Sequence, residues 1–141
     1  MPDEKQLWIH VRETRAVTIR RPFQVVSALL ADPLRYSDWA IDYFSGPVTE
    51  LDDNTYRVST VAGERRFRVD GDVRRGTFDL YLAPLDEAFS YPSPIRVLAN
   101  GDGVDVLFTL AREPWLSDEE WDSSLRALEN ELSALRRLLE A

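Results

Sequence analysis

Cysteine is absent from the 141-residue sequence, and histidine occurs once. Without cysteine there is no disulfide framework, no thiolate nucleophile and no sulfur-ligated metal site. A single imidazole is too few for metal centres that need two or three histidine ligands, so only carboxylate-bound ions remain open. We therefore predict neither a cofactor nor a metal site.

Long hydrophobic runs are also absent. No stretch reaches about 18 consecutive apolar residues, the length at which a segment becomes a candidate membrane-spanning helix. The opening residues, MPDEKQ, are polar and lead into no apolar segment of the kind found in signal peptides. We therefore expect a cytoplasmic protein that does not insert into a membrane.

Positive charge is scarce, because 17 lysine and arginine residues face 25 aspartate and glutamate residues and the net charge is −8. A chain this acidic repels phosphate backbones unless its basic residues gather on one face, so nucleic acid is not an expected partner. The length suits a single domain spanning residues 1–141. With 44% hydrophobic and 11% aromatic residues, the chain can fill a core and also line a cavity.

The most regular pattern lies in residues 117–140. Ser117 and Glu120 have the spacing of a capping box, which marks the start of a helix. The predicted helix has about 23 residues and a length of roughly 34 Å, so its apolar side needs an equally long surface to cover. The spacing also fits a coiled coil. A covered sheet face explains it better, because no other predicted element can cover the strands. The apolar stripe comprises Trp121, Leu125, Leu128, Leu132, Leu135, Leu138 and Leu139.

Residues 7–19 alternate in polarity and are rich in β-branched side chains, which predicts a long strand. Glu13 and Arg15 share the parity of its apolar residues, so without a bulge they point inward together as a buried ion pair. A bulge near Glu13 would instead turn both outward. His10 has the opposite parity and is expected at the surface rather than as a catalytic base.

Two short helices are predicted next. Pro22 suits the first turn of a helix, which stops at Asp32-Pro33 because the residue before a proline is pushed out of the helical conformation. A second short helix is predicted from Pro33 to Trp39. Turn signals then separate six further runs with strand alternation, at residues 48–51, 55–62, 66–73, 77–82, 95–99 and 104–110.

Consecutive strands joined by short turns pair antiparallel, and the alternation gives the sheet one buried face. The long C-terminal helix is the only predicted element that can cover that face. We therefore predict an α+β helix-grip fold, in which a curved seven-stranded antiparallel sheet wraps around the C-terminal helix. The two short helices lie between the first and second strands.

Residues 19–39, IRRPFQVVSALLADPLRYSDW, resemble a pattern of the START-like (SRPBCC, helix-grip) superfamily, which includes polyketide cyclase/dehydrase-like proteins. The shared features are an apolar strand end, a proline that begins a helix, an aspartate and a tryptophan. The resemblance covers the whole chain in the order of elements but is specific only over this segment. It indicates a fold rather than a chemistry, and it implies a cavity between the sheet and the C-terminal helix.

The apolar stripe of the helix offers such a cavity no histidine, serine, lysine or carboxylate. Acid–base catalysis needs a titratable group within reach of the substrate. Asp79 or Tyr81 would supply one only if the fifth strand had the opposite parity to the one we predict. We therefore predict no catalytic residue from these elements.

The favoured hypothesis is a binding module that holds a small hydrophobic or aromatic molecule, a lipid or polyketide-like compound, in this cavity. Inward residues of the strands and helix would line it, and aromatic residues of two loops would form its mouth, although they could equally plug the open end as core. The expected ligand-binding residues are Glu13, Arg15, Trp39, Tyr43, Phe67, Phe78, Leu80, Phe89, Tyr91, Phe108, Leu125, Leu128 and Leu132.

Two alternatives remain open. A cyclase or dehydratase would use Glu13 and Arg15 to orient a carbonyl-bearing substrate, and it requires a carboxylate in the cavity with a raised pKa. A protein-interaction domain, similar to co-chaperone or ribosome-associated members of the superfamily, would present aromatic residues of loops 40–46 and 85–93 as an apolar patch. The oligomeric state is undetermined, and a homodimer is one option.

Overall fold

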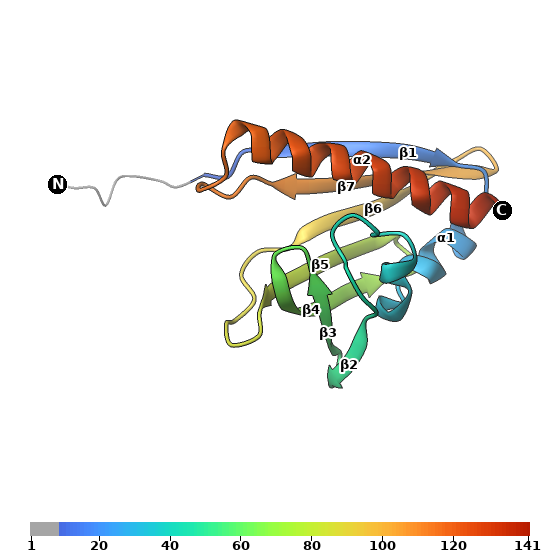
Figure 1. Ribbon diagram of the computed structural model, residues 1–141. Helices are drawn as coiled ribbons and strands as arrows, with labels where there is room; N and C mark the ends of the chain where they lie inside the picture. The colour runs from blue at the N-terminus through green and yellow to red at the C-terminus, as the bar shows by residue number, and fades with distance from the viewer. Residues whose placement is uncertain (1–8) are drawn as a thin grey trace.

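The computed structural model describes residues 9–141. Its seven strands form one antiparallel sheet in the order β1-β7-β6-β5-β4-β3-β2. The sheet is curved, and its concave face is turned toward α2 (Figure 1). The predicted fold class is therefore confirmed. The elements are β1 (Arg12–Ile19), α1 (Phe23–Leu30), η2 (Pro33–Asp38, a 3-10 helix), β2 (Thr49–Asp52), β3 (Thr55–Thr60), β4 (Gly63–Asp72), β5 (Thr77–Pro84), β6 (Ser93–Asn100), β7 (Gly103–Ala111) and α2 (Asp118–Glu140).

Five strands begin elsewhere than predicted. β2 and β7 differ by one residue each, and β4 starts at Gly63, three residues earlier than predicted. β1 starts at Arg12, and residues 7 and 8 of the predicted strand lie outside the described residues. β6 starts earlier than predicted, because Pro94 lies in the ladder opposite Asp79. A proline is tolerated there because it stands next to the first residue of the strand, where a missing amide donor costs least. No helix within residues 9–141 is long and apolar enough to cross a membrane.

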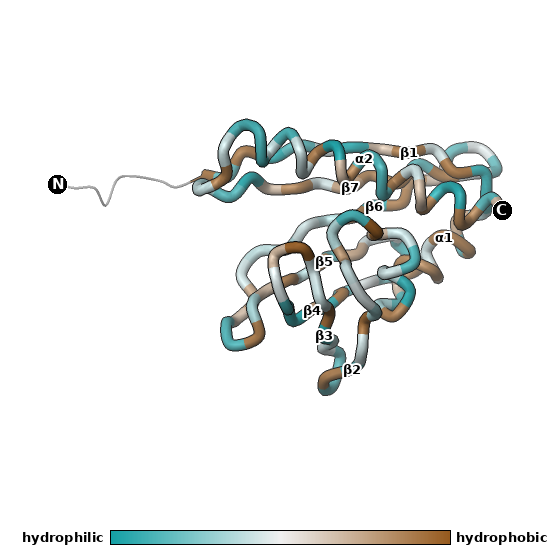
Figure 2. Tube along the Cα trace, viewed as in Figure 1, coloured by the Kyte–Doolittle hydropathy of each residue, from teal (hydrophilic) through white to brown (hydrophobic). Residues whose placement is uncertain are grey.

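The predicted capping box starts α2. The Ser117 hydroxyl accepts a hydrogen bond from the Glu120 amide at 3.1 Å, and the Glu120 carboxylate accepts one from the Ser117 amide at 2.8 Å. Hydrophobic and hydrophilic residues then alternate in bands along the helix (Figure 2). Leu132 and Leu135 are 2% and 0% exposed. The sheet of the same chain therefore covers the apolar stripe, and no coiled-coil partner is needed.

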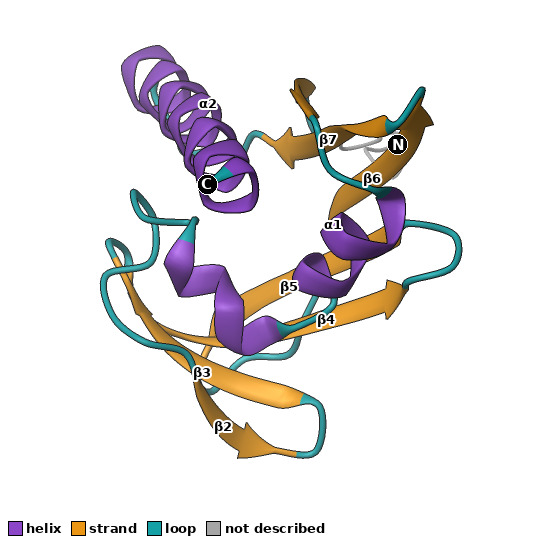
Figure 3. Ribbon diagram, turned by 90° about the vertical axis from the view of Figure 1, so that its right-hand side faces the viewer, coloured by secondary structure: helices purple, strands orange, loops and turns teal. Residues whose placement is uncertain are grey.

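The two short helical segments close one end of the sheet (Figure 3). Val26 and Leu30 of α1 are fully buried, and so is Tyr36 of η2, whose hydroxyl donates to the Leu30 carbonyl oxygen at 2.7 Å. The C-terminus of α2 reaches the same end, where Glu140 accepts a hydrogen bond from the Arg20 amide at 2.8 Å. We call this the closed end. The open end is the opposite one, where β1 and α2 begin and β5 and β7 finish.

Gly76, in the turn between β4 and β5, shows how tightly the closed end is packed. Its φ is +69°, and an added Cβ would lie 2.7 Å from the Val97 carbonyl oxygen and 2.8 Å from the Phe23 ring. Gly101 has a φ of +59° but open space around it. We expect Gly76→Ala to lower the free energy of unfolding by about 2–3 kcal/mol, since strain and crowding add. Gly101→Ala should cost about 1 kcal/mol from strain alone. Urea unfolding compares the two, and equal losses would contradict the tight packing.

Candidate functional site

Along β5 and β7, the side chains on the concave face are buried near the closed end and become partly exposed toward the open end. Along β7, Val104 is 0% exposed, Phe108 is 7% exposed, and Leu110 is partly exposed. Along β5, Phe78 is 0% exposed whereas Leu82 is partly exposed. On β5 and β7 the hydrophobic core is therefore complete toward the closed end and incomplete toward the open end.

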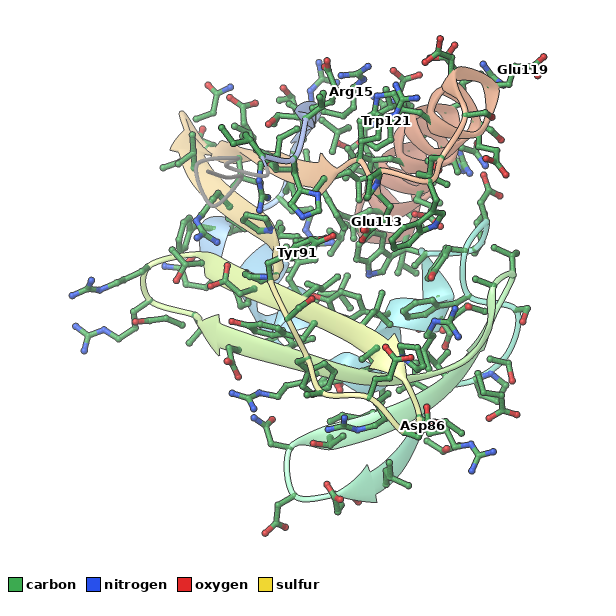
Figure 4. All side chains as sticks on the ribbon, turned by 90° about the vertical axis from the view of Figure 1, so that its left-hand side faces the viewer. Arg15, Asp86, Tyr91, Glu113, Glu119 and Trp121 are labelled. Atoms are coloured by element: carbon green, nitrogen blue, oxygen red, sulfur yellow. The ribbon has the colours of Figure 1, made fainter. Side chains whose placement is uncertain are left out.

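The N-terminal part of α2 shows the same change. The continuous core cluster includes α2 residues from Leu128 to Leu139, whereas Trp121 and Leu125 are buried outside that cluster. Figure 4 looks onto the open end and labels Trp121 on α2 and Arg15 on β1. The helix is thus held against the main core through its C-terminal half, and its beginning borders the open end.

Glu13 and Arg15 are adjacent, as predicted, but they are not buried. The β1–β7 register runs without a bulge, so both side chains are on the concave side of β1. Arg15 contacts Glu13 at 3.2 Å and Glu129 of α2 at 2.9 Å, and the side chains of Arg15 and Glu13 are 30% and 46% exposed. The hydrogen bonds that Arg15 donates to Glu129, and then to Glu13, raise the pKa of Arg15. The expected burial is wrong because β1 is an edge strand and α2 presents a carboxylate to it here.

A second polar group joins loop 85–93 to the end of β7. The Tyr91 hydroxyl donates to the Glu113 carboxylate, and the His10 ring lies 4.1 Å from the Tyr91 ring, centroid to centroid. His10 Nδ1 is 3.0 Å from the Arg112 carbonyl oxygen. Burial and the Glu113 hydrogen bond raise the pKa of Tyr91 well above its usual range. His10 is therefore a partly buried member of this group rather than a simple surface residue.

Phe89 lies on the convex face of the sheet instead of at the mouth. Its ring centroid is 5.7 Å from that of Tyr81 and 4.4 Å from the Arg66 guanidinium carbon. Asp79, on the same outward parity of β5, pairs with Arg96 at 3.1 Å. The parity predicted for β5 is confirmed, so Asp79 and Tyr81 do not reach the concave side.

The aromatic residues near loop 40–46 serve mainly as core. Trp39 is 1% exposed, and its ring packs 5.1 Å from Tyr36 and 6.4 Å from Phe108. Phe44 is 7% exposed and packs edge to face on Phe67 at 5.2 Å. Of this group only Tyr43 is partly exposed. These positions fit the alternative in which the aromatic residues of the loops fill the open end as part of the hydrophobic core.

Glu131 of α2 is the feature that the sequence analysis missed. It is 7% exposed, and its Oε2 accepts hydrogen bonds from the amides of Asp42 at 3.1 Å and Tyr43 at 2.9 Å. Burial raises the pKa of Glu131 to about 7, against the lowering effect of these two hydrogen bonds. The expectation that α2 brings no carboxylate to its packed side is wrong. The available signal was its spacing, because Leu128 and Leu135 are three and four residues away on the same side of the helix.

The other expected lining residues belong to the packed core. Phe67 and Phe78 are 0% exposed, Leu128 and Leu132 are 2% exposed, and Leu80 is 6% exposed. A polar pocket of about 560 Å³ lies instead at the closed end, lined by Ala31, Asn54, Val69, Asp70, Gly71, Asp72 and Thr77. It contains none of the expected ligand-binding residues. Residues 9–141 contain no group of three or more His, Cys, Asp or Glu that could hold a metal ion.

No protein-family model and no curated protein matches the sequence. Solved structures match almost the whole chain. The Zhui aromatase/cyclase from Streptomyces sp. R1128 shares 18% identity and a TM-score of 0.69, with 94% of both chains covered. A START superfamily protein from Mycobacterium smegmatis shares 14% identity and a TM-score of 0.68, with 93% of this chain and 97% of that chain covered. The chain has the START-like fold.

An uncharacterised protein from Bacillus thuringiensis also has this fold, with 14% identity, a TM-score of 0.74, and 93% of this chain and all 100% of that chain covered. Identities of 14% to 18% establish the START-like architecture and no shared chemistry. The function of this START-like chain must therefore be argued from its own residues.

Proposed function

We propose that this START-like chain binds a small, mainly apolar molecule at the open end, between the first half of α2 and the ends of β5 and β7. The observation that carries the proposal is the partial exposure of Leu82 and Leu110 on the concave face. The other inward residues of these two strands, from residue 78 to 80 and from 104 to 108, are at most 7% exposed. Covering such apolar side chains with a ligand removes them from water and is favourable.

The START-like architecture supports this placement. A curved sheet around a helix leaves a concave surface, and concave surfaces lined by apolar side chains are the usual sites for small ligands. The site differs from the one expected on sequence grounds, because Phe67, Phe78 and Leu132 belong to the buried core beneath it. Leu125, which is buried but lies outside the main core cluster, remains at the edge of the site.

Neither alternative function gains support. The cyclase or dehydratase hypothesis needs a buried Glu13, and the Glu13 side chain is 46% exposed and paired with Arg15. Glu131 has the raised pKa that such an enzyme would use, but two backbone amides already engage its Oε2. The protein-interaction hypothesis needs exposed loop aromatics, and Phe44 is 7% exposed while Phe89 packs beneath Arg66.

A neutral fluorescent dye, phenylnaphthylamine, tests the proposed site. The wild-type protein should bind it with enhanced fluorescence, and Leu110→Arg should weaken binding by at least about tenfold because a charge replaces apolar surface. Leu98→Arg is the control, since Leu98 is 52% exposed and points outward from β6. Absence of dye binding by the wild-type protein, or equal weakening by the two substitutions, would refute the site.

A further inference from the structure

Arg65 of β4 is the partly buried arginine of residues 9–141 whose guanidinium makes no hydrogen bond or ion pair to another segment. It donates only to the carbonyl oxygen of the preceding residue, Glu64, at 3.0 Å, and it forms no ion pair within residues 9–141. Each of the other partly buried arginines of residues 9–141 donates a hydrogen bond to a carboxylate, to a helix C-terminus or to another loop. These arginines are Arg15, Arg21, Arg66, Arg68, Arg96 and Arg112.

The strand register places Arg65 on the concave face at the open end. Arg65 is paired with Val58 of β3 and with Pro84 of β5, and paired residues of an antiparallel ladder lie on the same side of the sheet. Val58 is 1% exposed and Phe67, two residues along β4, is 0% exposed, so this side is the core side. Phe67 is in turn paired with Leu82. Arg65 is therefore the diagonal neighbour of Leu82.

That Arg65 forms no ion pair within residues 9–141 is unusual for so acidic a chain. The sequence has twenty-five carboxylates and a net charge of −8, yet no carboxylate of residues 9–141 forms an ion pair with Arg65. An anion bound here would gain charge-assisted hydrogen bonds from a guanidinium that is not already paired with a carboxylate of residues 9–141. Guanidinium binds carboxylates through two parallel hydrogen bonds, a geometry that ammonium lacks. Next to Arg65, Leu82 offers partly exposed apolar surface.

We propose that Arg65 binds the acidic head group of an amphipathic carboxylic acid, whose apolar body covers Leu82 and Leu110. This inference rests on the proposed function, because it uses the same apolar surface, and it adds the class of ligand. The open end then selects long-chain or aromatic carboxylic acids over neutral molecules of the same size. The specificity comes from one charge on β4 and the affinity comes mostly from apolar contact.

Isothermal titration calorimetry with dodecanoate and dodecanol, both below their aggregation limits, tests this selection. The wild-type protein should bind dodecanoate about tenfold more tightly than dodecanol, the difference expected for one partly exposed charge-assisted contact. Arg65→Gln should abolish the difference and leave dodecanol binding unchanged, whereas Arg65→Lys should keep only part of it, because the charge remains but the two parallel hydrogen bonds are lost. Arg74→Gln is the control, because it removes the same charge from an exposed turn position at the closed end.

The outcomes separate this inference from the proposed function. Equal affinity for the two compounds in the wild-type protein, or a preference for dodecanoate that survives Arg65→Gln, would overturn the role of Arg65 and leave the apolar site standing. Failure of both compounds to bind would overturn the apolar site and the ligand class together. Circular dichroism of each variant establishes that the compared proteins share the wild-type fold.

Discussion

Replacing Glu131 with glutamine is expected to stabilise the folded protein above neutral pH. The pKa of Glu131 is raised to about 7 in the folded state by burial, from an ordinary value of 4.5. The folded state therefore holds this proton more tightly than the unfolded state does, and the resulting stability is present below about pH 4.5 and lost as the pH rises through about 7. The full loss is about 3 kcal/mol, since a tenfold difference in proton affinity corresponds to about 1.4 kcal/mol.

Glutamine is a suitable replacement because its side-chain oxygen can still accept from the amides of Asp42 and Tyr43 without carrying charge. Asp42 is the charged group of loop 40–46 that faces Glu131, and its charge also raises the pKa of Glu131. Urea unfolding from about pH 5.5 to about pH 8.5 stays above the isoelectric point of 4.7. Over this range the stability of Glu131→Gln relative to wild type should grow by about 2 kcal/mol.

Glu119→Gln provides the control for this experiment. Glu119 lies in the first turn of the same helix and points into solvent (Figure 4). Removing its charge should change the free energy of unfolding by less than about 1 kcal/mol, through the helix dipole alone. If the advantage of Glu131→Gln were constant with pH, burial of the ionised carboxylate would not be the cause.

The second large effect is expected from Leu135→Ala, at the middle of the contact between α2 and the sheet. Leu135 is 0% exposed, and truncation of a fully buried leucine removes transfer free energy and leaves a cavity. The expected loss is about 3–4 kcal/mol in the free energy of unfolding. Urea unfolding followed by tryptophan fluorescence measures it.

Leu138→Ala is the matched control, because it makes the same chemical change in the same turn of α2 at a partly exposed position. Helix propensity changes equally in the two variants, so the difference between them reports packing. We expect Leu138→Ala to cost about 1 kcal/mol. Similar losses of unfolding free energy in both variants would mean that the buried stripe of α2 does not hold the helix against the sheet.

The elements that sequence predicted best are those specified by local spacing. The capping box of Ser117 and Glu120 and the interval pattern of the leucines fix where α2 begins and which side is apolar. Alternation along residues 77–82 similarly fixed the parity of β5, and Pro22 fixed the start of α1. Each of these signals is complete within a few residues, so no knowledge of distant segments was required.

The candidate site was less predictable because its residues are defined by their distant neighbours. Glu13 has the parity of a core residue, but its exposure follows from the position of β1 at the sheet edge. Glu131 lies at the border of the apolar stripe, and only loop 40–46 folding over it makes it buried. Phe89 belongs to a loop whose direction is set by packing against Tyr81 and Arg66.

By itself, the sequence determined an α+β chain with one long amphipathic helix and strands that have one apolar face, which suffices for the START-like architecture. Only the tertiary structure decided that the core is complete at one end and open at the other, with Leu82, Leu110 and Arg65 at the open end. The physical reason is the distance along the chain between the residues that determine each property. Periodicity records which side of an element avoids water, whereas burial and ion pairing depend on segments brought together from far along the chain.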